Sequence, residues 1–445
     1  MPKRLQRMRA LFAPLAASLK NIPDYRHTDF GLIASTTVLG IVVGLAIYIF
    51  HAGLSLSESF FSRFFVAAES NPLSFLRFLF FPLITAFGGL LVGIANQMLF
   101  QGVQADNLAS VHHAIKEEGG VMSERVSLRA ILTAALSIGS GGGAGREAPT
   151  VVLGASIGST LGRLLRLKPD QLRVLCGAGT AAAISGIFNA PLAGVVFAIE
   201  AVVGHLTVQS FIPLVISSVM ATATSRLFLG DRPILITPGL LHITLEDYAF
   251  LAVAGMASGG VAIYFLRVYS WGFKKVTMTL KPVAPYLRPA IGGLGAGFMV
   301  ALLPTMLETT YEPVNLAILG RGALLVAVLT VILKPLSTAL TLGSGGAGGT
   351  FAPALKVGAM FGFAFGYILQ LVFPGTSPGL YALVCCAAVL AGCYRMPLAG
   401  GLLIFEISRN YGLILPLMFA SVFATFIVHR SGIRTFNPSV SDSSR

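Results

Sequence analysis

Two motifs occur twice in the chain at nearly the same spacing, and this internal repeat constrains the fold more than any other feature. The segment GSGGGAGREAP at 139–149 matches GSGGAGGTFAP at 343–353, an offset of 204 residues. Further along, SGIFNAPLAGVVFAIE at 185–200 matches AGCYRMPLAGGLLIFE at 391–406, an offset of 206 residues. Because two separate matches share almost one offset, the chain is predicted to consist of two homologous halves.

The composition indicates that both halves lie in a membrane. The chain is 55% hydrophobic and 11% charged, whereas soluble domains carry about 25% charged residues. The net charge of +13 is better explained by Lys and Arg at membrane edges than by nucleic-acid binding, since basic residues of membrane proteins collect on the cytoplasmic side. Basic residues near both ends predict cytoplasmic termini, and we expect a multi-pass protein of the inner (cytoplasmic) membrane with the lipid bilayer as a partner.

The repeat and the charge pattern together divide the chain. We predict a basic cytoplasmic segment at 1–29, a first membrane repeat at 30–229 and a linker at 230–244. A second membrane repeat follows at 245–430, and a short cytoplasmic tail at 431–445. The fold class expected is an all-α integral membrane protein.

The apolar segments are interrupted by Gly and Pro, which predicts helices that stop partway through the bilayer. The first apolar segment lies at 31–50, but several others are shorter than the ~20 residues that a perpendicular span needs. Pro149 and Pro353 suit the first turn of a helix, where a missing N–H costs little. A helix N-terminus inside the bilayer offers N–H groups and a positive partial charge, so each repeat predicts one half of an anion site.

Glu147 stands at the first of these predicted helix starts. An ionised carboxylate at the bilayer centre costs about 2.5–3.5 kcal/mol and marks a functional site by default. At a helix N-terminus it can occupy the place of a permeant anion, and protonation or displacement would release it. The alternative is a static ion pair with the adjacent Arg146. The second half has Thr350 and Phe351 at the matching positions, so neither charge is needed to build this element.

Other classes of function find little support in the residues. No CxxC pair or His cluster suggests a metal, and we expect no cofactor. An intramembrane enzyme, the remote alternative, needs a nucleophile with a base. Ser140 and Ser344 lie in GSG segments without a GxSxG motif or a histidine in an apolar segment. We therefore expect a transport protein and not an enzyme.

Three motifs in order resemble the CLC family of chloride channels and proton-coupled chloride transporters. They are GREAP followed by TVVLGASIG, FNAPLAG with a following Glu, and GGTFAPAL before a Gly-rich helix. The resemblance extends over nearly the whole chain. It implies inverted halves of many tilted and broken helices, and a homodimer in which each subunit has its own pore.

The resemblance also implies a set of site residues. Glu147 resembles the external gating glutamate of the family, and the backbone amides of the two glycine-rich motifs resemble its chloride ligands. The implied anion-binding residues are Gly145, Arg146, Glu147, Ala148, Gly349, Thr350, Phe351 and Ala352.

The chain departs from the family at the side chains that normally contact the ion or carry the proton. Val103 in GVQAD stands where the family has a serine, and the late tyrosine has no match, with Arg434 or Phe436 in its region. Val103 and Phe436 are thus candidate pore-lining residues. The internal proton-transfer glutamate is replaced by Ala201, while Glu200 beside it, like its repeat equivalent Glu406, is interpreted as structural.

These departures favour chloride transport through a pathway gated by Glu147 that is channel-like or weakly coupled to protons. Two alternatives keep the fold. In one, water replaces the missing glutamate and anion/proton antiport survives. In the other, the anion is fluoride or another small anion, with Thr350 bonding the gate.

Overall fold

The computed structural model describes residues 29–69, 74–101, 107–204, 208–231, 233–237, 247–307 and 311–437. Several predictions lie outside these ranges. They concern Val103, nearly all of the basic segment at the N-terminus, and the last eight residues of the tail.

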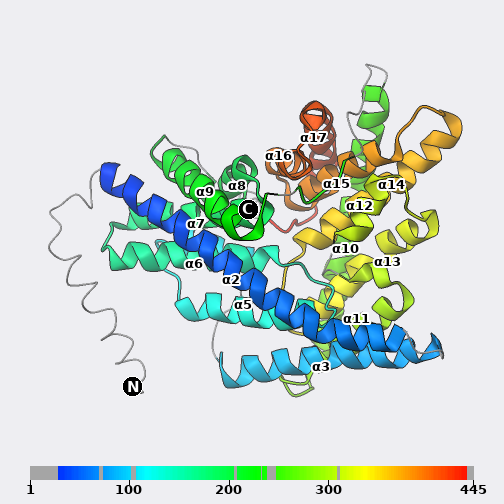
Figure 1. Ribbon diagram of the computed structural model, residues 1–445, viewed down its shortest axis with the longest axis horizontal. Coiled ribbons are helices and arrows are strands. Elements are labelled where there is room, and N and C mark those ends of the chain that lie inside the picture. Colours follow the sequence, from blue (N-terminus) through cyan, green and yellow to red (C-terminus); the bar gives the residue numbers. More distant parts are fainter. Residues whose placement is uncertain are drawn as a thin grey trace.

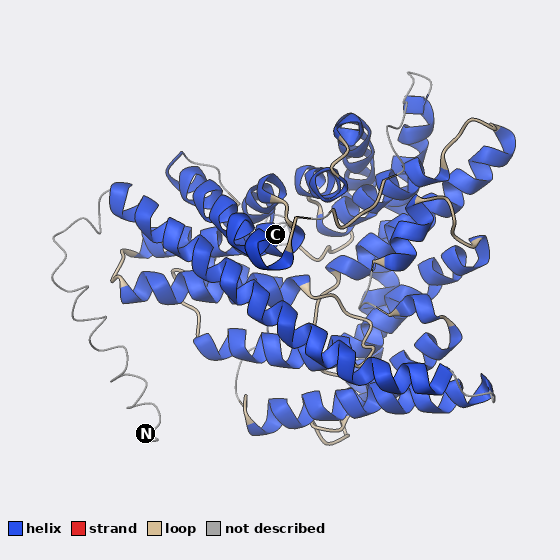
Figure 2. Ribbon diagram, in the orientation of Figure 1, coloured by secondary structure: helices blue, strands red, loops and turns tan. Residues whose placement is uncertain are grey.

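The described residues form α-helices joined by short turns, with no β-strand among them (Figures 1 and 2). In Figure 1, α5 to α9 lie on the left and α10 to α15 on the right. The helices are α2 (Asp29–Glu69), α3 (Arg77–Met98), α4 (Leu108–Lys116), α5 (Glu124–Gly139), α6 (Glu147–Leu164), α7 (Pro169–Phe188), α8 (Pro191–Ala198), α9 (Val208–Leu229), α10 (Asp247–Leu280), α11 (Arg288–Leu302), α12 (Glu312–Ile318), α13 (Leu324–Gly343), α14 (Phe351–Val372), α15 (Pro378–Tyr394), α16 (Pro397–Ser408) and α17 (Ile414–Arg430).

Helix length and composition agree with a membrane protein. Eight helices in the described part of the chain are long and apolar enough to cross a bilayer, and four shorter apolar helices accompany them. Helices α7, α8, α15 and α16 all begin with proline at the first helical position. Proline there lacks only an N–H that has no acceptor within the helix, so it starts these helices at fixed points. The predicted all-α membrane fold is confirmed.

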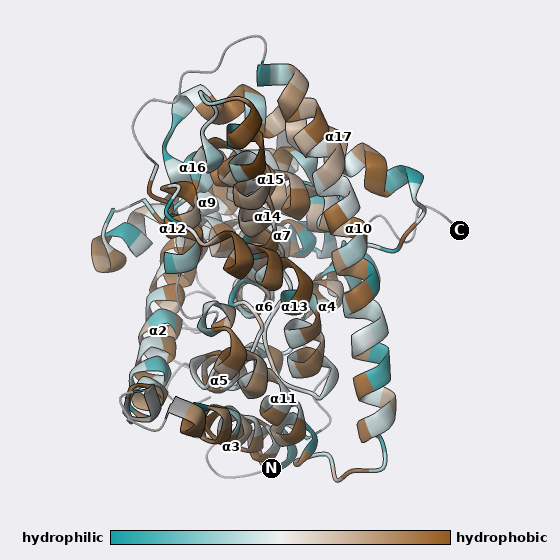
Figure 3. Cartoon of the chain, turned by 90° about the vertical axis from the view of Figure 1, so that its right-hand side faces the viewer, coloured by the Kyte–Doolittle hydropathy of each residue, from teal (hydrophilic) through white to brown (hydrophobic). Residues whose placement is uncertain are grey.

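Helix α15 lies at the centre of the core. Every residue from Pro378 to Tyr394 is buried, and the ribbon around α14 and α15 is mostly hydrophobic in Figure 3. An apolar helix in a bilayer can face either lipid or protein, and the burial of every residue shows that α15 is enclosed by its neighbours. Its surroundings place the end of α15, at Tyr394, in the interior of the molecule.

Paired glycines bring α6 against α7 and α14 against α15. A Cβ atom on Gly154 or Gly158 would lie 2.1 or 2.2 Å from carbonyl oxygens of α7. On Gly358 or Gly362 it would lie 2.5 or 2.0 Å from carbonyl oxygens of α15. The two pairs are again 204 residues apart. Such small residues let helix backbones approach closely in membranes, and here they fix the two helices that begin at the glycine-rich motifs.

Glu200 and Glu406 cap helices in opposite halves of the sequence. The N–H groups of Leu398 and Ala399, at the start of α16, donate to the Glu200 carboxylate at 3.3 and 2.8 Å. The equivalent N–H groups at the start of α8 donate to Glu406 at 3.0 and 2.7 Å. Each carboxylate satisfies helix-terminal donors that have no acceptor within their own helix. These bonds agree with the structural interpretation of Glu200 and Glu406.

Candidate anion pathway

The loops that precede α6 and α14 pair with each other through their backbones. The Gly145 N–H donates to the Gly349 carbonyl oxygen at 2.8 Å, and the Gly349 N–H donates to Gly145 at 2.7 Å. This single antiparallel bridge joins the two copies of the glycine-rich motif. It uses the N–H groups of these two glycines, so the N–H groups that remain for a ligand belong to the first turns of the helices.

Helix α13 holds the first loop from the side. The Gly143 N–H donates to the Thr341 hydroxyl at 2.9 Å, and the Thr338 hydroxyl donates to the Gly143 carbonyl at 2.8 Å. The loop therefore has both backbone groups of its central glycine satisfied within the bilayer, where irregular backbone is tolerated only under this condition.

Glu147 begins α6 and reaches toward α14. Its side chain is buried, with 2% of the residue exposed. One carboxylate oxygen accepts the Ala352 N–H at 3.3 Å, and the other accepts the Tyr311 hydroxyl at 3.3 Å. A carboxylate thus lies where the N-terminus of α14 would hold a free anion. Gly145 makes room for it, since a Cβ atom there would lie 2.3 Å from the carboxylate.

Tyr311, just before α12, contacts both members of the Arg146–Glu147 pair. Its hydroxyl donates to Glu147, and the Arg146 guanidinium lies over its ring at 5.8 Å from the centroid. Glu147 thus contacts the start of α14 and Tyr311, while the Arg146 guanidinium lies against the tyrosine ring.

A cavity of about 350 Å³ opens beside the two helix N-termini. Ala148, Gly349 and Thr350 line one part of it, and Asn107 and Arg129 line another. Aromatic rings form much of the remaining wall, contributed by Tyr269, Phe273, Tyr394 and Phe436. The cavity is large enough for a hydrated monatomic ion, and Arg129 is the charged residue among its described lining residues.

Thr350 and Tyr394 form a hydroxyl pair on the cavity wall. Their oxygens are 2.7 Å apart, and both residues are buried. The Thr350 hydroxyl therefore bonds Tyr394 in this structure, whereas the fluoride alternative had it bond Glu147. The neighbouring Phe351 packs its ring against Phe188, Phe197 and Tyr394, with centroids 5.4 to 5.9 Å apart.

Phe436 lies on the cavity wall, as its candidate role requires. Its N–H donates to the Cys393 carbonyl at 3.0 Å, which fixes the chain after α17 against the end of α15. Its ring contacts Tyr394 and Tyr269 with centroids 5.4 and 5.0 Å apart.

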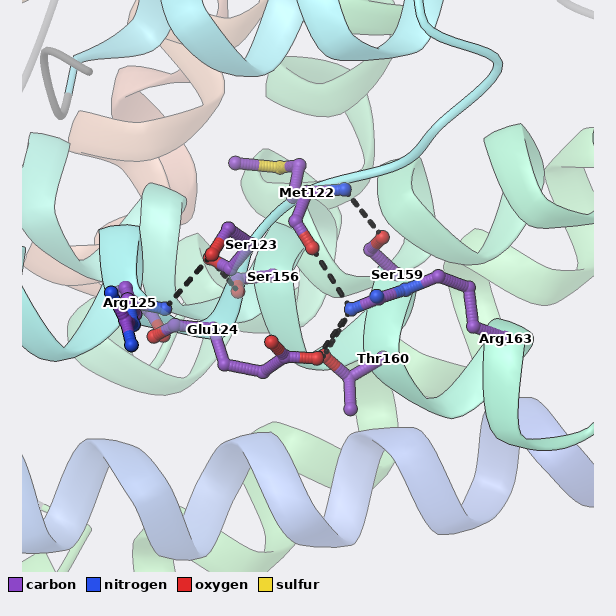
Figure 4. A network of polar contacts seen from close by, with 9 residues as sticks. Met122, Ser123, Glu124, Arg125, Ser156, Ser159, Thr160 and Arg163 are labelled. Carbon is purple, nitrogen blue, oxygen red and sulfur yellow. Dashed lines mark hydrogen bonds and ion pairs between the residues drawn. The ribbon is translucent and has the colours of Figure 1, made fainter. Parts of the chain in front are cut away.

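The far end of α6 is fixed by a polar network (Figure 4). Arg163 donates to the Met122 carbonyl at 2.9 Å and pairs with Glu124 at the start of α5. The Met122 N–H donates to the Ser159 hydroxyl at 2.8 Å. Because α5 leads into the glycine-rich loop, the hairpin of α5 and α6 is held at both ends, and Glu147 projects from a rigid support.

Sequence reasoning missed Tyr311, Tyr269 and Tyr394. Tyr311 and Tyr269 have no sequence signal, because they belong to no repeated motif. Tyr394 did have one: in the second repeat it occupies the position of Phe188 in the first. That substitution places a hydroxyl at one of the two equivalent positions beside Phe351.

Comparison with known proteins identifies the family. A sequence profile described as "Voltage gated chloride channel" matches residues 88–429. The chain belongs to this family. A ClcB-like chloride channel protein of Ralstonia nicotianae is 32% identical over 356 residues, 79% of this chain and 82% of that protein. The chloride channel protein CLC-f of Arabidopsis thaliana is 30% identical over 78% of this chain but 46% of its own length.

Solved structures of the family share the fold. A slow cyanobacterial Cl⁻/H⁺ antiporter matches with a TM-score of 0.78 at 23% identity, covering 93% of this chain and 97% of that one. A CLC-type fluoride/proton antiporter matches with a TM-score of 0.75 at 22% identity, covering 92% and 97%. The CLC resemblance seen in the three sequence motifs is confirmed, and so is the CLC-like architecture.

Proposed function

We propose that this chain carries chloride, or another small anion, across the membrane through a pathway that the Glu147 carboxylate closes. The observation that carries the proposal is the hydrogen bond from the Ala352 N–H to that carboxylate. A helix N-terminus binds anions, and here a side chain takes that place. The carboxylate leaves when it is protonated or when an incoming anion competes with it. The first-turn N–H groups of α6 and α14 then become ligands of the anion. These include the proposed ligands at Ala148, Phe351 and Ala352.

We further propose that anion flux is uncoupled from protons or only weakly coupled. Ala201 is fully buried and carries no titratable group. The adjacent Glu200 has its carboxylate engaged by two N–H groups of α16. Both N–H bonds are stronger to the charged carboxylate than to the protonated acid, so this cap disfavours the uptake of a proton on each cycle.

The test uses purified protein in liposomes loaded with chloride, with anion efflux and external pH recorded together under a set potassium potential. The proposal predicts chloride efflux with little or no accompanying proton movement. Chloride efflux that drives protons uphill would instead support antiport with a rerouted proton path. Fluoride efflux without chloride efflux would support the fluoride alternative.

Two copies of the chain are proposed to associate, each with its own pathway, as the family resemblance implies. Both termini are proposed to face the cytoplasm. Because one chain has a mass of 46.6 kDa, mass measurement in detergent by light scattering should give twice that value, about 93 kDa, for the protein component. A protein mass of one chain would contradict the dimer.

A further inference from the structure

The hydroxyl pair of Thr350 and Tyr394 has one proton that no described group accepts. Two hydroxyls carry two protons, and the bond between them uses one, whichever residue donates. The described residues offer neither hydroxyl another hydrogen-bond partner. Thr350 is 8% exposed and Tyr394 is 5% exposed, so bulk solvent does not reach them freely. A buried donor without an acceptor is unfavourable, so the spare O–H points to an acceptor in the adjacent cavity.

The space in front of the pair is suited to an anion. Both residues line the 350 Å³ cavity, together with Ala148 and Gly349 from the two helix starts. No carboxylate is found among the described residues that line it, and Arg129 adds a positive charge. Hydroxyl donors and a guanidinium on the same cavity wall favour an anion over a cation there.

We propose that the Thr350–Tyr394 hydroxyl pair is a side-chain ligand of the transported anion and sets the preference among anions. The proposal rests on the proposed function, because it assumes that anions pass through this cavity. The pair donates its spare O–H to the ion, and the bond between the two hydroxyls polarises that donor. A single O–H favours an ion of concentrated charge, such as chloride, over nitrate, whose charge is spread over three oxygens.

The arrangement predicts an unusual pattern in a double-mutant cycle. Thr350→Val and Tyr394→Phe each remove one hydroxyl without changing side-chain volume greatly, and each leaves one O–H that can still donate to the ion. Each single variant should therefore lower the chloride-to-nitrate flux ratio by no more than about threefold. The double variant has no donor left and should lower the ratio by about tenfold or more.

The experiment measures chloride and nitrate flux in liposomes for the wild type, both single variants and the double variant. Tyr381→Phe is the matched control. Tyr381 lies on the same helix, is fully buried with an unbonded hydroxyl, and does not line the cavity. Its variant should keep the wild-type ratio. Combining Tyr394→Phe with Thr350→Ser restores one hydroxyl and should recover most of the preference, which a purely structural role of the pair would not predict.

The outcomes separate this inference from the proposed function. If the wild type conducts anions and the double variant keeps the wild-type ratio, the inference is wrong and water satisfies the spare proton. If the wild type conducts neither anion, the proposed function is wrong, and the inference that rests on it is wrong with it. Should the double variant not fold, bromide can replace chloride in crystals of the wild type. An anomalous signal in contact with either hydroxyl supports the inference, and bromide bound elsewhere in the cavity overturns it.

Discussion

At the scale of single residues, the proposed gate is the Glu147 carboxylate, and its contacts include two long hydrogen bonds. Glu147 accepts one hydrogen bond from the Ala352 N–H and one from the Tyr311 hydroxyl, each at 3.3 Å. A hydrogen bond to a charged group contributes about 1.5–3 kcal/mol, and two long ones lie at the lower end. Neither of these two bonds alone would prevent the carboxylate from leaving, as the proposed gate requires.

Replacing Tyr311 by Phe should open the gate more often. The variant loses the hydrogen bond from Tyr311 to the carboxylate, while the ring that lies under Arg146 stays. With about 1.5 kcal/mol lost from the closed position, anion flux at neutral pH should rise up to about tenfold. Liposome flux assays compare the variant with Tyr381→Phe, which should behave as the wild type. Equal or lower flux in Tyr311→Phe would show that the tyrosine does not hold the gate.

Glu147 could be predicted from sequence because it combines a costly charge with a glycine-rich helix start. Tyr311 could not, since 164 residues separate it from Glu147 and no spacing rule connects them. Tyr394 was an intermediate case. The repeat placed it opposite Phe188, but only the folded chain shows that its hydroxyl meets Thr350 beside the cavity.

At the scale of helices, close packing positions the two helix starts. The helix starts at Glu147 and Phe351 were predicted from the glycine-rich motifs with proline in the first turn. The length of α2 was not predicted. Its apolar segment ends near residue 50, yet the helix continues to Glu69. Ser57 in this extension packs against Gly139 of α5, where an added Cβ atom would lie 2.3 Å from the Ser57 hydroxyl oxygen. Such a tertiary contact leaves no pattern in the local sequence.

Replacing Gly154 by Leu should separate α6 from α7. A Cβ atom at this position would lie 2.1 Å from a backbone oxygen of α7, which cannot move aside as a flexible side chain can. Overpacking of this kind costs about 1–3 kcal/mol or more. Thermal unfolding in detergent should show a clear fall in the midpoint. Gly260→Leu is the control, because no atom lies within 4 Å of the added Cβ, and a similar fall there would contradict the packing argument.

At the scale of the whole molecule, contacts at two separate places join the two homologous halves. The Gly145–Gly349 bridge joins the loops at the proposed anion site, and Glu200 and Glu406 join α8 to α16. The repeat offsets predicted that these pieces are equivalent. The repeat offsets did not show that each glutamate caps a helix of the opposite half. A repeat identifies equivalent segments but does not predict the contacts between the two copies.

Changing Glu200 to Gln should weaken the joint between halves without altering proton movement. The amide offers one acceptor oxygen in place of two, so the N–H of Leu398 or Ala399 loses its acceptor, at a cost of about 1 kcal/mol or more. Glu406→Gln should lower stability by a similar amount, since it caps the equivalent donors. Unfolding midpoints and proton flux are measured on the same samples. A change in the ratio of protons to anions in Glu200→Gln alone would contradict a purely structural role.

The most direct test of the account compares anion flux as a function of pH in the wild type and in Glu147→Gln. The amide cannot carry the charge that competes with the anion at the start of α14, and it cannot change protonation. The account predicts that wild-type flux rises as pH falls, while the variant conducts at every pH with no pH dependence. A variant that elutes as folded protein yet conducts no anion, or keeps the wild-type pH dependence, would contradict the claim that Glu147 is the gate.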